Sequence, residues 1–535
     1  MNLFTRTLAG VGLAATLLTG TATIAMAETP DNMLVIAHRI DDLTSLDPAE
    51  SFEIQGSDAS RNIYMKLVNL FPDDLEAGYQ PEIAESWEVS EDGRTITFTI
   101  KDGLTFHSGN PIRAEDVEFS LRRAVLMDKT PAFILKQFGF TPENVEQTIV
   151  ADGNTVSITT DQTYATSFVL NCLTATIGGV VDKELVMANE VDGDFGNTWL
   201  KTNSAGSGAY KLVSWKPNES LTLESNPDFY LGAPEMERVI VRHVTESASQ
   251  RLLLERGDID VARNLNPEDI QGASAAEGVE IAEELRGRLM YVALNQKHPE
   301  LSKPQVRQAF KMLIDYEGME NSFLKGAYTT HQNFLPRTYL GAVDENPFTY
   351  DVEAARALIE EAGVPEGLEI ELGVREAQER IEIAQALQNA AAQVGITINI
   401  TVGTSAQILA RYRARELDVY VGAWGPDYPD PHTNAGTFAY NPDNSDEANA
   451  TGLLAWRNSW DTGGLTEMVD AAVIEPDRDM RAQMYRDIQA QFRETSPFAV
   501  MFQLTEQIGL RDNVDNLSLG GPITNAAYWN VTKGE

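Results

Sequence analysis

The sequence DVYVGAWGPDYPDP, residues 418–431, gives the clearest structural signal in the chain. Apolar side chains alternate from Val419 to Ala423, as in a β-strand, and the strand runs directly into Trp424 and a proline-rich turn that carries Asp427. In open α/β sheets, small molecules bind outside the carboxyl ends of the strands. An aromatic ring and a carboxylate at this point therefore predict a ligand site, and an ordinary exit from strand to loop is the alternative.

The residues before this stretch alternate between strand and helix patterns. Judged by the spacing of apolar residues, the segments are a strand at Leu368–Val374, a helix at Gln378–Val394, a strand at Ile396–Val402, and a helix at Ala406–Glu416 with Ser405 as its N-cap. Short connections and right-handed crossovers make the three strands parallel, so their carboxyl ends share one edge of an α/β sheet. That edge is predicted to present Arg375, the helix start at Thr404 and the Trp424–Asp430 turn.

The first half of the chain has a different pattern. A strand is predicted at Met33–Ala37, and two hairpins are predicted at 87–100 and 149–158, each around an Asp-Gly pair. Between the hairpins, a helix is predicted over Ala114–Val125, because apolar residues recur at helical spacing and acidic residues occupy its first turn. Residues 63–199 are therefore expected to form a unit of the α+β class.

The chain begins with the three parts of a secretory signal. Arg6 lies in a short n-region, an apolar core covers Leu8–Leu18, and a small-x-small site precedes residue 28, so cleavage is predicted after Ala27. An uncleaved anchor is the alternative, but the apolar core is shorter than the roughly 18 to 20 residues that span a bilayer. Residue 28 is Glu and not Cys, so a lipid has no acceptor there. We expect a freely soluble protein of a Gram-negative periplasm.

The composition restricts the partners of this chain. Lys and Arg number 41 against 80 Asp and Glu, which gives a formal net charge of −39. Such a chain repels nucleic acid and anionic membrane surfaces. Cys172 is the single cysteine, so no intramolecular disulfide can form and stability must come from hydrophobic cores. With 535 residues, two or three domains are expected.

The sequence contains no catalytic signature. It lacks G-x-S-x-G, P-loop, H-E-x-x-H and C-x-x-C motifs, and its six histidines show no metal-ligand spacing, so we expect no cofactor and no metal. Asp427 and Asp430 could form the acid–base pair of a hydrolase, but neighbouring carboxylates in a proline-rich turn are commonly turn formers. A carboxylate in a partly dry cleft suits an ammonium group better. Trp424 and Tyr428 could stack on a ligand or pack in a core.

Motifs spread over the whole mature chain occur together in one known family. They are PEIAESW at 81–87, SEDG at 90–93, GLTFHSG at 103–109, AEDV at 114–117, GSGAY at 206–210, NPD at 226–228, LERGDID at 254–260, Asn295 with VRQA at 306–309, and the Trp424–Pro431 turn. This set closely resembles the family 5 solute-binding proteins of ABC importers, which include dipeptide-, oligopeptide- and nickel-binding proteins. The resemblance implies a type II periplasmic binding protein fold: two lobes with a hinge and an extra α+β domain.

The resemblance also implies where the domains lie. The signal peptide is residues 1–27, and the remainder divides into domain I (28–62, 200–290 and 505–535), domain II, which is the extra α+β domain (63–199), and domain III, which is the α/β lobe (291–504). The hinge strands are expected near Ala293–Gln296 and Met501–Leu504.

The resemblance assigns roles to residues of the site. In peptide-binding relatives the Asp of the W-x-x-D-Y turn, here Asp427, holds the α-ammonium group of the peptide. No motif aligns the Arg that meets the peptide carboxylate, and Arg375 and Arg337 are candidates. The other residues expected to contact the ligand are Phe52 and Glu53 of the segment Ala49–Ser60, Trp424, Gly425 and Tyr428.

We therefore interpret the chain as a monomeric periplasmic receptor. It is expected to capture a short peptide, or a similar small zwitterionic or cationic solute, and to deliver it unchanged to an ABC permease and ATPase complex. Pro426 and the run Asp430–Asn434 depart from the peptide-binding pattern, so alternatives stay open. One alternative keeps the fold but binds a sugar conjugate, an opine-like compound or a nickel chelate. A second is a periplasmic hydrolase that uses Asp427 and Asp430. A third is a sensor that reports to a chemoreceptor.

Overall fold

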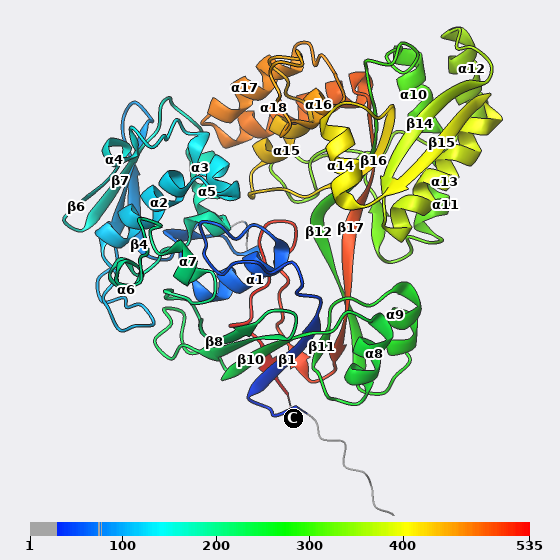
Figure 1. Cartoon of the computed structure of the whole chain (residues 1–535). Helices are drawn as coiled ribbons and strands as arrows, with labels where there is room; N and C mark the ends of the chain where they lie inside the picture. Colours follow the sequence, from blue (N-terminus) through cyan, green and yellow to red (C-terminus); the bar gives the residue numbers. More distant parts are fainter. Residues whose placement is uncertain (1–28, 73–74, 76–77, 535) are drawn as a thin grey trace, which may run out of the picture.

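Two lobes joined by a pair of long antiparallel strands make up the protein (Figure 1). The computed structural model describes residues 29–72, 75 and 78–534, so the predicted signal peptide and its cleavage site lie outside the described residues. The joining strands are β12 (Val279–Leu294) and β17 (Phe498–Arg511), which pair along most of their length. Because both strands run from one lobe into the other, the two lobes share one continuous sheet.

That sheet extends to both sides of the β12–β17 pair. Its other strands are β1 (Met33–His38), β8 (Tyr210–Lys216), β9 (Ser220–Ser225), β10 (Arg238–His243), β11 (Val261–Ala262), β13 (Tyr328–Thr330), β14 (Leu368–Arg375), β15 (Ile396–Gly403) and β16 (Val419–Trp424). The 11 strands follow the order β15-β14-β16-β12-β17-β11-β1-β10-β9-β8, with β13 beside β17. The lower lobe of Figure 1 therefore holds the β11 side of the sheet, and the upper lobe holds the β16 side.

The strand and helix order predicted before the Trp424 turn is confirmed. β14, α13 (Gln378–Gln393), β15, α14 (Ser405–Arg413) and β16 follow one another, and β15 and β16 both pair in parallel with β14. The cap of α14 differs from the prediction: Thr404 is the N-cap, and the Gln407 amide donates to its hydroxyl at 3.4 Å. The helix also ends before Glu416, since Arg415 takes a left-handed conformation with φ of 62°.

The two predicted hairpins form a separate sheet of four strands. They are β4 (Ala84–Val89) with β5 (Thr95–Ile100), and β6 (Ile149–Asp152) with β7 (Thr155–Thr159), in the order β4-β5-β7-β6. The predicted helix between them is α2 (Ala114–Met127), which packs against β6 and β7. Asp116 in its first turn accepts from the amide of Arg113 at 2.8 Å, which closes the N-terminus of the helix.

Shorter elements complete the two lobes. The other helices are α1 (Ile54–Ile63), α3 (Phe133–Lys136), α4 (Val145–Thr148), α5 (Thr166–Thr174), α6 (Lys183–Ala188), α7 (Asn197–Leu200), α8 (Ser247–Glu255), α9 (Pro267–Ala273), α10 (Pro304–Met312), α11 (Tyr316–Glu320), α12 (Val352–Glu361), α15 (Pro431–Phe438), α16 (Leu454–Arg457), α17 (Leu465–Ile474) and α18 (Arg478–Thr495). Two-residue strands pair β2 (Val68–Asn69) with β3 (Gln80–Pro81) and β18 (Val514–Asp515) with β19 (Thr532–Lys533).

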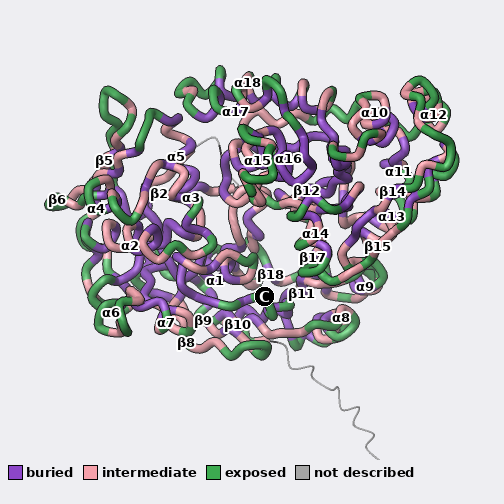
Figure 2. The backbone as a smooth tube through the Cα atoms, turned by 45° about the horizontal axis from the view of Figure 1, so that its top comes forward, coloured by how far each residue is buried: buried purple, intermediate pink, exposed green. Residues whose placement is uncertain are grey.

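Buried apolar side chains form one large core in the first half of the chain. It joins residues of β1 and α1 to residues of β5, α2 and α5, so the lower lobe and the 63–199 unit share that core. In the upper lobe, Val419 and Val421 of β16 belong to one cluster and Tyr420 to another, as expected for a strand whose two faces are both covered. Figure 2 shows buried residues inside both lobes and exposed residues along outer helices such as α6 and α12. The domain and hinge boundaries stay predictions.

Two further properties concern the described residues alone. Within the described ranges, no helix is long and apolar enough to cross a bilayer. Nor does this part of the chain hold a cluster of three or more His, Cys, Asp or Glu side chains suited to a metal ion.

A buried ion pair in the shared core gives a first prediction. Arg123 of α2 donates from Nη1 and Nη2 to the two carboxylate oxygens of Asp47, each at 2.8 Å, and both side chains are buried. Arg123→Ala leaves Asp47 without its cation, and we expect the free energy of unfolding to fall by about 3–5 kcal/mol. Lys136→Ala breaks an exposed pair with Asp128 and is expected to cost less than about 1 kcal/mol. Urea unfolding measures both variants, and equal losses would contradict this ranking.

Candidate functional site

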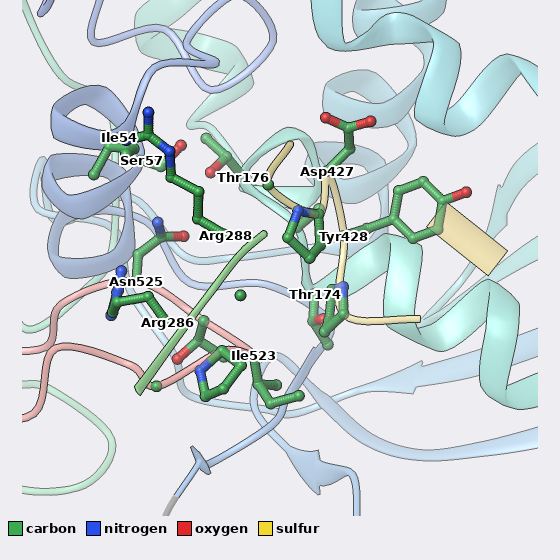
Figure 3. Close-up of a pocket in the computed structure, with 18 of the residues that line it drawn as sticks. Ile54, Ser57, Thr174, Thr176, Arg286, Arg288, Asp427, Tyr428, Ile523 and Asn525 are labelled. Atoms are coloured by element: carbon green, nitrogen blue, oxygen red, sulfur yellow. The ribbon is translucent and has the colours of Figure 1, made fainter. Parts of the chain in front are cut away.

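A cavity of about 310 Å³ lies between the two lobes, where β16 ends (Figure 3). Its volume is at the lower end of the about 300–1,000 Å³ of small-molecule sites. The lining comes from both lobes and from the strands that join them: Phe52, Ile54, Ser57, Lys66, Pro131, Ile134, residues 174–177, residues 286–288, Tyr339, residues 425–429, Leu504, Glu506 and residues 521–525. A ligand held here would contact both lobes at once.

Asp427 lies on the wall of this cavity. It follows β16 in a turn that is fixed from the other side, because its backbone amide donates to Oγ1 of Thr433 at 3.0 Å. Among the described residues, no ion pair or hydrogen bond reaches its carboxylate. Figure 3 shows that carboxylate well separated from the guanidinium groups of Arg286 and Arg288. Burial raises the pKa of Asp427 to about 7, since the charged form loses hydration without gaining a cation.

The aromatic residues of the turn face away from the cavity. Tyr428 is buried, its ring packs on Phe168 at 6.0 Å between centroids, and its hydroxyl donates to Oε1 of Gln137 at 3.3 Å. It lines the cavity, but Figure 3 shows its ring directed away from Arg288. Trp424 is not part of the lining; it is half-buried against the upper-lobe core, opposite Leu289 of β12. Both rings are placed for packing between structural elements.

The other predicted site residues are divided between the cavity and its surroundings. Gly425 and Phe52 line the cavity, and Phe52 meets Phe133 edge to face at 5.9 Å. Glu53 is exposed at the start of α1 and is outside the lining, and Arg375 is half-buried at the end of β14, also outside it.

Arg337 is occupied within the upper lobe. Its Nε donates to Asp344 at 2.8 Å, its Nη1 to Thr329 at 3.0 Å and its Nη2 to the carbonyl of Thr330 at 2.8 Å. These bonds use all three nitrogen atoms of the guanidinium group, and Arg337 does not line the cavity. It is therefore not placed to meet a carboxylate there.

Sequence patterns missed the basic residues of β12. Arg286 lines the cavity but is engaged, since it donates to the Leu519 carbonyl and its Nε lies 3.5 Å from Oε2 of Glu506. Arg288 also lines the cavity, and in the described part of the chain no side-chain hydrogen bond or ion pair reaches it. Figure 3 shows it extending toward Ile54 and Ser57 of α1. The Arg-Gly-Arg run at 286–288 could have indicated these basic residues, because such a run is unusual in a strongly acidic chain.

Gly287, between these arginines, permits close packing of the turn. A Cβ at this position would lie 2.9 Å from Cδ and 3.0 Å from Cγ of Pro426, closer than side chains normally approach. The glycine in β12 and the proline of the turn therefore fit together. Pro426, which departs from the peptide-binding pattern, thus packs directly on β12.

Lys66 and Glu82 form a buried pair at the cavity wall, in which Oε2 of Glu82 accepts from the backbone amide of Lys66 at 2.9 Å. Lys66 lines the cavity, and its Nζ donates to the carbonyl of Thr174 at 2.5 Å. Burial lowers the pKa of Lys66 to about 7 and raises the pKa of Glu82 to about 7. The pair was not identified from the sequence, because its members lie 16 residues apart with no motif around them.

Asp430, three residues after Asp427, is fully engaged. Oδ1 accepts from the His432 amide at 2.8 Å and from Nη2 of Arg481 at 2.7 Å, and Oδ2 accepts from Nη1 of Arg481 and Nδ2 of Asn171, both at 2.9 Å. Burial opposes ionisation, but the ion pair with Arg481 keeps the pKa of Asp430 below its ordinary value. Asp430 is therefore not free to act as an acid or base beside Asp427, which the hydrolase alternative requires.

The bond to Asn171 connects the upper lobe to the 63–199 unit. Asn171 lies on α5, and the hydroxyl of Tyr79 donates to its Oδ1 at 2.8 Å, which turns its amide nitrogen toward Asp430. The amide of Ala165 also donates to the carbonyl of Val473 at 3.1 Å. Figure 1 shows α5 next to α17. The two lobes thus meet through directed polar bonds beside the cavity.

Comparison with known proteins identifies what this arrangement is similar to. The family model described as "Bacterial extracellular solute-binding proteins, family 5 Middle" matches residues 78–446. The probable D,D-dipeptide-binding periplasmic protein DdpA of Escherichia coli K12 is 27% identical over 496 residues, which cover 92% of each chain.

Solved structures share the fold at low identity. DppA from Helicobacter pylori in complex with the peptide STSA has a TM-score of 0.76 and 22% identity, covering 94% of this chain and 98% of that one. AgaA from A. tumefaciens R10 in complex with agropinic acid has a TM-score of 0.73 and 21% identity, covering 94% and 99%. The predicted fold, with two lobes and an additional α+β unit, is confirmed by these matches.

The contact between Asn171 and Asp430 yields a second prediction. Asn171→Asp replaces an amide donor by a carboxylate, and at pH 8 we expect repulsion from Asp430 to separate α5 from α15. Small-angle X-ray scattering should show a larger radius of gyration than in the unchanged protein. Asn389→Asp, on the exposed face of α13, is the control and should leave the scattering unchanged. Identical curves for all three proteins would show that this bond does not hold the lobes together.

Proposed function

Because the chain belongs to the bacterial extracellular solute-binding proteins of family 5, we propose that it captures a short peptide, or a similar small solute with an ammonium group, for delivery to an ABC-type permease. Proteins of this family are transport receptors and not enzymes. The observation that carries the choice of ligand is the unpaired carboxylate of Asp427 in a cavity between two lobes.

Asp427 has no partner among the described residues that would stabilise its charge. A half-buried carboxylate loses hydration, and its charged form becomes favourable again only when a cation or hydrogen-bond donors replace the lost water. No described side chain supplies either. An ammonium group of a ligand would supply both, through a charge-assisted hydrogen bond. Asp427 is therefore the proposed amine anchor.

Arg288 supports a ligand that carries opposite charges at its two ends. It lines the same cavity and is also without a side-chain partner among the described residues. Figure 3 places its guanidinium group away from Asp427, so an anion and a cation of one solute could be held apart. A zwitterion such as a short peptide has this arrangement, and Arg288 is a better-placed partner for its carboxylate than Arg337.

A non-peptide solute is the second candidate. It is supported by AgaA, a structure of the same fold that holds agropinic acid. Gentle purification from the periplasm, followed by denaturation and mass analysis of the released ligand, separates the candidates. A peptide mass supports the first proposal, and a sugar or metal conjugate supports the second.

Removal of the Asp427 charge gives a third prediction. Titration calorimetry with L-alanyl-L-alanine as the probe is expected to show binding to the unchanged protein. Asp427→Asn should weaken that binding by at least about 30-fold, since it removes a buried charge partner worth about 2–5 kcal/mol. Asp512→Asn, an exposed change after β17, is the matched control and should have no effect. Equal affinities of Asp427→Asn and the unchanged protein would refute the anchor role.

The raised pKa of Asp427 gives a fourth prediction, on pH. The free site binds a proton below about pH 7, and an ammonium ligand requires the ionised form. Above about pH 8 the affinity should fall, because the α-ammonium group of the dipeptide loses its proton there, so binding is tightest between about pH 7 and 8. Below about pH 6 the affinity should fall towards tenfold per pH unit, with release of one proton on binding. In Asp427→Asn this slope should disappear. A slope that persists in the variant would assign the proton to another group, such as the Lys66–Glu82 pair.

A further inference from the structure

A partition divides the space between the two lobes. The cavity that Asp427 lines has a volume of about 310 Å³, and a second cavity of about 690 Å³ lies next to it. Three of the described residues line both cavities, namely Tyr339, Pro429 and Ile523. Since a residue that lines two cavities lies between them, these side chains form the partition. We call the cavity with Asp427 the first cavity and the other one the second cavity.

The second cavity also lies between the lobes. Tyr79 and Asn171 line it from the 63–199 unit, and Leu340 and Arg481 line it from the upper lobe. Its volume exceeds that of the first cavity and is within the range of small-molecule sites, about 300–1,000 Å³. Space for a larger solute therefore lies directly behind the partition.

The loop that carries Ile523 is fixed at both ends. Before Ile523, the amide of Leu519 donates to Oε2 of Glu284 at 2.9 Å, and Glu284 belongs to β12. After Ile523, the amide of Ala526 donates to Oδ1 of Asp58 at 2.9 Å, and Asp58 belongs to α1. These two bonds hold the Ile523 side of the partition against elements of the lower lobe and the joining strands.

Tyr339 is held from the upper lobe by a strained backbone. Thr338, the residue before it, has a φ of 77°, a left-handed conformation that is unfavourable for a β-branched residue. Arg337 precedes Thr338, and its amide donates to Oε1 of Gln503 of β17 at 3.0 Å. Strain of this kind persists only where the surrounding structure enforces it, and it occurs most often at functional sites. The position of Tyr339 is thus imposed by the fold.

The two sides of the partition meet across the lobes. The hydroxyl of Tyr339 donates to the carbonyl of Pro522 at 3.1 Å, and the Tyr339 side chain is buried. Figure 3 shows Ile523 well separated from Asp427 among the residues that line the first cavity. Tyr339 and Ile523 therefore close the first cavity at a distance from the proposed amine anchor.

We propose that Tyr339 and Ile523 set the largest solute that the protein binds, because they close the first cavity off from the second. This inference rests on the proposed function, in which Asp427 holds the ammonium group of the solute. A dipeptide with small side chains fits within the first cavity. A larger solute has to displace the partition, which breaks the bond between Tyr339 and Pro522 and disturbs a packed interior. The preferred solutes are then small zwitterions without bulky side chains.

The test compares two dipeptides that have the same charged ends and differ in size. In calorimetry on the intact exported protein, L-alanyl-L-alanine should bind at least about tenfold more tightly than L-alanyl-L-tryptophan, since the larger solute leaves a buried hydrogen-bond donor unpaired. Ile523→Ala opens the partition, so L-alanyl-L-tryptophan should gain at least about tenfold relative to L-alanyl-L-alanine. Ile240→Ala, at a half-buried position of β10 outside both cavities, is the matched control and should keep the original preference.

Tyr339→Phe is the second variant, since it keeps the aromatic ring and removes only the bond to Pro522. Displacement of the ring then leaves no hydroxyl unpaired, so L-alanyl-L-tryptophan should gain here too, by less than in Ile523→Ala. The unfolding temperature of each variant shows that it is folded. Equal binding of the two dipeptides to the unchanged protein, or no gain for L-alanyl-L-tryptophan in the folded variants, overturns the proposal.

Mass analysis of co-purified solutes distinguishes failure of the partition from failure of the peptide proposal. If neither dipeptide binds to any of these proteins, the peptide proposal fails, and the partition is judged by the solutes that stay bound during gentle purification. Heavier solutes in Ile523→Ala than in the unchanged protein support the partition as a limit on size, whatever their chemical class. The same solutes in both proteins, or none in either, overturn it.

Discussion

The ion pair between Asp430 and Arg481 is the interaction on which the arrangement of the site depends. It lies at the start of α15, it fixes the turn that carries Asp427, and it presents an oxygen to Asn171 of the opposite lobe. Asp427 and Asp430, three residues apart, thus lie in opposite electrostatic environments. Asp430 is paired with Arg481, and its pKa is lowered. Asp427 has no such cation, and its pKa is raised. Asp430, which is paired, holds the structure, and Asp427, which is unpaired, is the proposed anchor for a ligand.

The elements with strong local periodicity were predictable from the sequence. The succession from β14 to β16, both hairpins and the position of Asp427 after a strand all follow from patterns within about 20 residues. The hinge strands expected near Ala293–Gln296 and Met501–Leu504 came from the resemblance alone. The pairing of β12 with β17 was not predictable from local patterns, because Val279 pairs with Arg511 and no local pattern records such a distant partner. For the same reason the predicted site was incomplete: Arg288 and the 521–525 loop reach the cavity only through that pairing, while Glu53 and Trp424 lie outside its lining.

The charges of the protein are distributed unevenly. The chain as a whole is strongly acidic, whereas the cavity wall holds Lys66, Arg286 and Arg288. A purely anionic solute is repelled by the surface before it reaches these cations, and a purely cationic solute meets them inside. A solute that carries both charges is repelled neither by the acidic surface nor by the cations of the cavity wall. For the proposed function, this distribution of charge would favour a solute that carries both a positive and a negative group over one that carries a single sign of charge.

The continuous sheet through both lobes has a mechanical consequence. β12 and β17 are paired on both sides of the junction, and the register shifts between Leu285 and Leu289 and between Met290 and Tyr291. The lobes are therefore connected by a two-stranded ribbon with a local irregularity and not by loose chain. A ribbon of this kind bends about a few irregular positions while its pairing stays fixed. A rotation of one lobe against the other would then bend the sheet at these irregular positions and leave the paired segments on either side intact.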